Sequence, residues 1–173
     1  MLAGARNVIF LGGDDNPSNL RDHAATALST SLPERVLAQL SPILSEHPRL
    51  PLRRLLAAAS APLSPRVAAR LCCCHERSLR RHLAAAGLPP LQALLGWFRL
   101  LHAANLLDDR GRSIDNVSRV LGFASANAMR NQFQHYVGAT PGYLRREGAS
   151  ELVLNAFAVV LLPPPEFSGG LRA

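Results

Sequence analysis

Two segments of this sequence match each other when the chain is shifted by 50 positions. Each copy reads as a short helix, a turn of a few residues and a second short helix, with apolar residues spaced to bury the two helices against each other. The matched positions are Val67/Val117, Ala68/Ser118, Leu71/Leu121, Leu79/Met129, Arg80/Arg130 and Leu83/Phe133. A duplication of this kind limits the chain to an all-α fold with two equivalent subdomains.

Local start and stop signals define each copy as a helix-turn-helix unit. Hydroxyl caps precede the first helices at Ser64 and Ser113, and Pro65 supplies a favourable first helical residue. Glycines end the second helices. The predicted helices are 65–71 and 75–85 in the first unit (64–87), and 113–121 and 125–137 in the second unit (113–138).

A long helix joins the two units. Pro89-Pro90 predicts its start and Leu107 its end. At 1.5 Å per residue such a helix is about 27 Å long. We expect Trp97 and Phe98, which lie within it, to pack between the two subdomains. Thr140-Pro141 predicts one more short helix, 141–147.

The positive charge is concentrated in this duplicated region. The chain has 19 basic residues, all of them Arg, and 12 acidic residues, which gives +7 and a pI near 10.9. Residues 64–148 hold 12 of the Arg and five of the acids, so they carry the excess. Charge spread over several short helices favours a nucleic-acid partner over a membrane surface. A solubilising Arg-rich surface is the alternative.

Residues from about Leu52 to Arg146 resemble the DNA-binding domain of the AraC/XylS-type regulators. The matching motifs are Ser113-Ile114-Asp115-Asn116-Val117-Ser118, Gly122-Phe123, Met129, Phe133, Gly138, Thr140-Pro141 and Arg145, with Arg99, Ala103 and Leu106-Leu107 in the linker helix. The first unit departs from the family pattern at its turn, Cys72-Cys73-Cys74, and at His75, where a small alcohol is usual.

The resemblance implies a bacterial transcription regulator that binds double-stranded DNA. Its two recognition helices would enter successive major grooves, about 34 Å apart. A cytoplasmic location is expected because the first residues lack the pattern of a signal peptide and the three consecutive cysteines suggest no disulfide framework. RNA polymerase and a second copy of the chain are the further partners to consider. The competing hypothesis is a helical protein-interaction module that uses the same scaffold without DNA.

Seven residues are predicted to contact DNA from the second helix of each unit. Arg suits guanine or a phosphate, Asn can pair with adenine, and Ala can contact a thymine methyl group. The predicted contact residues are Arg77, Arg80, Arg81, Ala126, Asn127, Arg130 and Asn131.

Enzyme, metal and membrane functions are not expected. The sequence contains no nucleophile elbow, Walker loop, zincin motif or dinucleotide-binding motif. Four adjacent side chains, Cys72 to His75, cannot easily converge on one zinc ion, so they indicate turn residues or a redox-sensing thiol. The longest mostly apolar stretch, Leu152–Leu162, is far shorter than the ~20 residues of a membrane helix. No cofactor is predicted.

The two ends of the chain are harder to interpret. Residues 1–50 are predicted to form a short, mostly helical extension, with a short strand or buried turn at Asn7–Leu11, a helix from Pro17 to Ser29 and another from Pro33 to Leu44. The extension could be a remnant of a receiver domain or a dimerisation arm. A further helix is predicted at 51–59, within the DNA-binding domain (51–147). Residues 148–173 are a C-terminal tail without an assigned structure.

Overall fold

The described part of the chain is entirely helical. The computed structural model describes residues 32–42 and 48–161, and no strand occurs among them. The helices are 32–40, α2 (Arg49–Ala58), α3 (Pro65–Leu71), α4 (Glu76–Ala85), α5 (Leu91–Leu107), α6 (Ile114–Val120), α7 (Ala126–Val137), α8 (Pro141–Glu147) and α9 (Ala149–Leu161). The expected all-α fold is confirmed, whereas the strand and helix expected within residues 7–29 lie outside the described residues.

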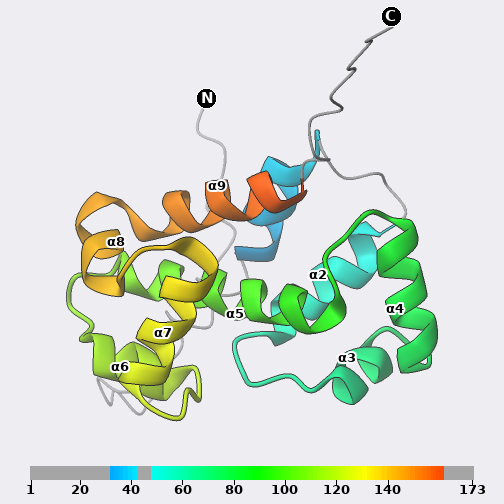
Figure 1. Cartoon of the computed structure of the whole chain (residues 1–173), viewed down its shortest axis with the longest axis horizontal. Coiled ribbons are helices and arrows are strands. Elements are labelled where there is room, and N and C mark those ends of the chain that lie inside the picture. Colours follow the sequence, from blue (N-terminus) through cyan, green and yellow to red (C-terminus); the bar gives the residue numbers. More distant parts are fainter. Residues whose placement is uncertain (1–31, 43–47, 162–173) are drawn as a thin grey trace, which may run out of the picture.

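Helix α5 forms the centre of the molecule. The other labelled helices surround it, with α3 and α4 toward one end and α6 and α7 toward the other (Figure 1). Leu94, Leu100 and Leu107 on α5 have no exposed surface or almost none. Trp97 and Phe98 are also buried, as the sequence predicted. Since a helix that is apolar on most sides must be covered on most sides, α5 is the core of the domain as well as the link between its units.

The helix starts follow the predicted caps. The side chains of Ser64, Ser113, Ser125 and Thr140 each accept a hydrogen bond from the backbone N–H three residues ahead, at 3.0 to 3.3 Å. His75 takes the corresponding place before α4 without a side-chain cap. Local sequence therefore sets most boundaries in both units.

The two units are equivalent in structure, but the predicted alignment of their first helices is wrong by one residue. Left-handed backbone occurs at Cys73 (φ 54°) and at Gly122 (φ 64°), 49 positions apart. The buried pair Ala68-Ala69 on α3 likewise corresponds to Val117-Ser118 on α6. The second helices keep the 50-residue offset because the turn of the second unit is one residue longer.

Helix α9 covers α5 and was not expected. Phe157 packs against Trp97 and Phe98, with ring centroids 5.4 and 5.9 Å apart. Asp108, beyond the end of α5, accepts a hydrogen bond from the backbone N–H of Ala149 at 2.7 Å and so caps the start of α9. Part of the segment interpreted as a tail thus belongs to the core. Among the described residues, neither this helix nor any other is long and apolar enough to cross a membrane.

Helix 32–40 also packs onto the domain. Its Leu32, Val36 and Leu40 are buried. Polar contacts join it to α2 through the Glu34–Arg53 ion pair and to α5 through a hydrogen bond from Arg35 to Asn105, 3.2 Å long. Figure 1 shows this helix in blue beside α2 and α9. These contacts make residues 32–40 part of the same core.

Candidate nucleic-acid interface

Helices α4 and α7 each bury one side and expose the other. On α4, Leu79 and Leu83 face the core, and on α7, Met129 and Phe133 do. Six of the seven predicted contact residues are exposed, and Ala126, at the start of α7, is half-buried. The exposed set comprises Arg77, Arg80, Arg81, Asn127, Arg130 and Asn131. Each helix therefore presents a polar, solvent-accessible surface opposite its apolar stripe.

The predicted residues occupy the same positions in the two units. The 50-residue offset of the second helices pairs Arg80 with Arg130, each one residue beyond the buried Leu79 or Met129. It also pairs Arg77 with Asn127, Arg81 with Asn131 and Glu76 with Ala126. The two polar surfaces share a geometry but differ in chemistry: the first carries three Arg and one acid, and the second carries one Arg and two Asn.

An ion pair within α4 was missed by the sequence reasoning. Arg80 Nη2 lies 2.5 Å from a carboxylate oxygen of Glu76, one helical turn earlier, and both side chains are exposed. The i, i+4 spacing of these opposite charges is the signal that could have revealed it. The pair holds the Arg80 guanidinium at the start of the helix and partly neutralises it.

Three other Arg on these surfaces differ from Arg80 because no ion pair holds them in the described part of the chain. In the part of the chain that the structure describes, Arg77, Arg81 and Arg130 form no ion pair. Their exposed guanidinium groups can therefore accept an anionic partner without breaking an existing charge contact. Arg130 combines this property with a central position on α7.

The turn of the second unit is fixed by the linker helix. The ring of Phe123 is half-buried and lies beneath the guanidinium of Arg99, whose central carbon is 3.8 Å from the ring centroid. A cation over an aromatic face is a favourable contact, so α5 holds this turn by stacking as well as by hydrogen bonds. Burial lowers the pKa of Arg99.

Comparison with known proteins also identifies a helix-turn-helix domain in this chain. The family model described as "Helix-turn-helix domain" matches residues 68–147. Two proteins described as uncharacterized HTH-type transcriptional regulators, Rv1395 of Mycobacterium tuberculosis and Mb1430 of Mycobacterium bovis, are each 35% identical to this chain over 74 residues. Those residues are 43% of this chain but only 21% of each relative.

The matched region coincides with the structural duplication. It begins within α3 and ends with α8, so it includes α5 and the second helix of both units. The motifs that resemble the AraC/XylS-type regulators lie in the same interval, on helices whose caps and buried residues have now been located. Residues 68–147 therefore match a helix-turn-helix domain in sequence as well as in structure, and they resemble the DNA-binding domain of the AraC/XylS-type regulators.

Proposed function

We propose that this chain is a bacterial transcription regulator that binds double-stranded DNA sequence-specifically, with α4 and α7 in successive major grooves. The observation that supports this best is the pair of equivalent, exposed, Arg-bearing helix surfaces at the two ends of α5. A helix in the major groove reads base edges through side chains on its exposed side. The excess of Arg in residues 64–148 provides the attraction to phosphate.

The two helices would read different bases. On α7, Arg130 suits the O6 and N7 atoms of guanine, Asn127 and Asn131 suit adenine, and Ala126 can contact a thymine methyl group. On α4, Arg80 is the equivalent of Arg130, while Arg77 and Arg81 are suited to phosphates on either side of the groove.

The remaining roles of a regulator are also part of this proposal. Binding to chromosomal DNA requires a cytoplasmic location. Activation of transcription would involve RNA polymerase, and a second copy of the chain would extend the DNA site. The two named mycobacterial relatives are described as transcriptional regulators, which supports the general role.

The test is a binding titration with a duplex selected from a random pool. Arg130→Ala should cost about 1–3 kcal/mol on the selected site and relax the preference at one base pair. Arg53→Ala, which removes the same charge from α2, should leave that preference intact. Binding should also weaken steeply with salt. A full-length chain that shifts no duplex at low salt would refute the proposal and favour the protein-interaction alternative.

A further inference from the structure

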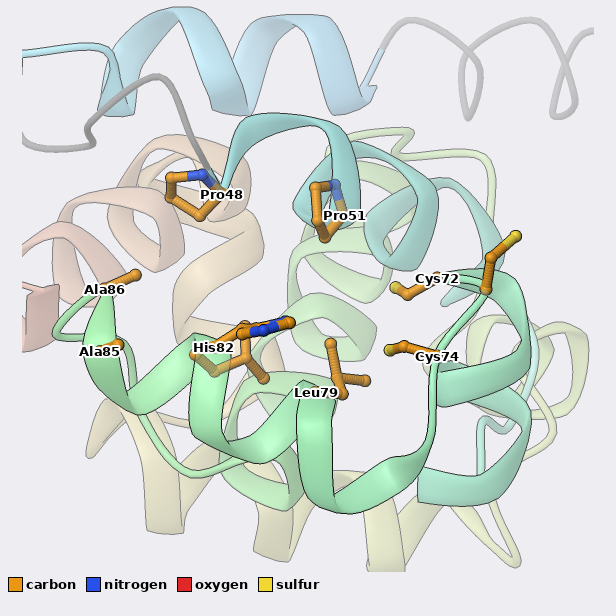
Figure 2. Close-up of a pocket in the computed structure, with 10 residues that line it drawn as sticks. Pro48, Pro51, Cys72, Cys74, Leu79, His82, Ala85 and Ala86 are labelled. Atoms are coloured by element: carbon orange, nitrogen blue, oxygen red, sulfur yellow. The ribbon is translucent and has the colours of Figure 1, made fainter.

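A cavity of about 480 Å³ lies between the start of α2 and the first helix-turn-helix unit (Figure 2). Its wall is mostly apolar. The lining residues are Pro48, Pro51, Cys72, Cys73, Cys74, Leu79, His82, Leu83, Ala85 and Ala86. This volume falls within the range of about 300–1,000 Å³ that is usual for sites of small molecules.

Thiols are the reactive groups of this cavity. All three cysteines are free, and Cys72 and Cys74 are half-buried. Figure 2 shows the sulfur atoms of Cys72 and Cys74 directed into the space above Leu79. Cys73 is exposed, and its sulfur lies 3.9 Å from Nη1 of Arg54. The turn thus presents two thiols to an apolar space and a third to solvent.

We propose that this cavity binds a small, mostly apolar electrophile, such as an enone or a quinone, and that the thiol of Cys74 captures it. The sulfur of Cys74 adds to the β-carbon of the activated double bond, and the thiol proton ends on the α-carbon. One C–S bond forms and the C=C bond becomes single, so the addition needs no oxidant or reductant. The apolar wall favours ligands with an apolar hydrocarbon part, and the thiol favours those that carry an activated double bond.

Cys72 is a poor candidate for the nucleophile. Burial raises the pKa of its thiol, the neighbouring Cys74 and Cys73 thiols raise it further, and Arg54 opposes part of this shift. Because the thiolate is the nucleophilic form, a raised pKa makes the Cys72 thiol less reactive than an ordinary thiol. The capture is therefore assigned to Cys74, the other half-buried thiol whose sulfur is directed into the cavity (Figure 2), and the role of Cys72 is to line the cavity beside the captured ligand.

Capture at Cys74 would act on the DNA-reading helix, a step that depends on the proposed DNA-binding function. The backbone N–H of Cys74 donates to the carbonyl of Ala69 at 3.1 Å, which closes the turn between α3 and α4. Helix α4 begins two residues later, at Glu76. An adduct in this cavity contacts Leu79 and Leu83, which lie on the buried side of α4, and we expect this new contact to shift the helix that carries Arg80.

The experiment compares an apolar and a charged maleimide on the full chain. N-phenylmaleimide carries an apolar ring, and N-(2-carboxyethyl)maleimide carries a charge. Peptide mass spectrometry gives the rate at each cysteine, and dividing the rate at Cys74 by the rate at Cys73 corrects for the different intrinsic reactivity of the two reagents. We expect this ratio to be on the order of tenfold higher for N-phenylmaleimide than for the charged reagent, since burying a ring contributes this much binding. Equal ratios for the two reagents, or modification confined to Cys73, would overturn the proposal.

Substitutions then test whether the cavity and Cys74 cause the faster reaction with N-phenylmaleimide. Ala86→Leu should narrow the cavity and remove most of the N-phenylmaleimide advantage at Cys74, with unchanged rates at Cys73 showing that the turn is intact. If this variant fails to fold, Cys74→Ser and Cys72→Ser decide the question. Rapid labelling by N-phenylmaleimide should disappear in Cys74→Ser and persist in Cys72→Ser. The reverse result would contradict the assignment of Cys74 as the nucleophile.

A DNA titration tests whether capture at Cys74 weakens DNA binding, independently of whether the cavity binds the ligand. The Cys74 adduct should bind a selected duplex at least several-fold more weakly than the unmodified chain, whereas treated Cys74→Ser should not change. If the adduct binds the duplex as tightly as the unmodified chain, capture at Cys74 does not affect DNA binding, and this part of the proposal is wrong. An unmodified chain that binds no DNA would refute the proposed function, and the labelling rates would still decide whether the ligand site exists.

Discussion

Arg99 donates two hydrogen bonds to the backbone carbonyl of Leu121, through Nε at 3.2 Å and Nη2 at 2.9 Å. Leu121 is the C-terminal capping residue of α6, so the linker helix satisfies one of the carbonyl groups that a helix end leaves free. The same guanidinium covers the ring of Phe123. One side chain of α5 therefore holds both the end of α6 and the turn that leads to α7.

Replacement of Arg99 by Lys should lower the free energy of unfolding by about 1–2 kcal/mol. Lysine keeps the charge but lacks the planar fork that makes both hydrogen bonds and stacks on Phe123. Urea denaturation measures the change. Arg53→Lys is the matched control, because Arg53 is exposed and, among residues 32–42 and 48–161, pairs with Glu34 alone, and it should have almost no effect. Equal costs for the two variants would contradict a specific role for Arg99.

The stability of the domain should fall as the pH is lowered, because of His102. Its ring is buried, and Nε2 lies 2.6 Å from the carbonyl of Leu56, where it must donate as N–H. Burial lowers the pKa of His102 below its usual 6.5, although the bond to Leu56 opposes the shift. The unfolded chain therefore binds a proton before the folded chain does, and stability is lost as the pH falls from 6.5 through the folded-state pKa.

Denaturation at several pH values tests this prediction. The wild-type chain should lose up to about 1.4 kcal/mol per pH unit relative to His102→Gln, which does not titrate. His135→Gln removes an exposed imidazole and serves as the control. Parallel curves for the wild type and His102→Gln would show that His102 does not cause the acid sensitivity.

Gly96 permits the close packing of α7 on α5. A Cβ atom at this position would lie 2.8 Å from Cζ of Tyr136, whose ring packs edge-on against Trp97. We expect Gly96→Ala to destabilise the fold by about 1–3 kcal/mol through overpacking. The cost should be clearly smaller in a Tyr136→Ala background, because the clashing ring is gone. Additive costs in a double-mutant cycle would show that this contact is not the cause.

Removing the charge of Glu76 should strengthen DNA binding, if the proposed function is correct. Glu76→Gln releases Arg80 from its ion pair and removes a carboxylate that repels phosphate. Affinity for an unselected duplex at low salt should rise several-fold, and the salt dependence should steepen by about one phosphate contact. Glu34→Gln, which breaks the ion pair with Arg53 on α2, should change neither quantity. Weaker binding by Glu76→Gln would instead indicate that the carboxylate itself contacts a base.

Features encoded within one helical turn were predicted well. Ser64, Ser113 and Thr140 cap the helices expected of them because the cap and its N–H partner are three residues apart. The alternation of buried and exposed positions on α4 and α7 also follows from sequence spacing. For this reason six of the seven predicted contact residues are exposed, while their contact with DNA stays a prediction.

Features that depend on distant contacts were not predicted. Helix α9 is apolar on several sides, so it has little periodicity, and its cap comes from Asp108, 41 residues before Ala149. The roles of Arg99 and His102 likewise depend on carbonyl groups 22 and 46 residues away. The one-residue error in aligning the repeats arose because Cys73 adopts a backbone conformation that the sequence suggests only for glycine at Gly122.

Helix α9 has a consequence for the spacing of any DNA site. Because α9 packs on α5, the helix that joins the two helix-turn-helix units is held inside the core and cannot act as a hinge. A rigid connection sets the rotational phase between the units as well as their separation. Inserting half a helical turn, about five base pairs, between two half-sites should therefore abolish simultaneous contact by both units, whereas two flexibly tethered units would tolerate it.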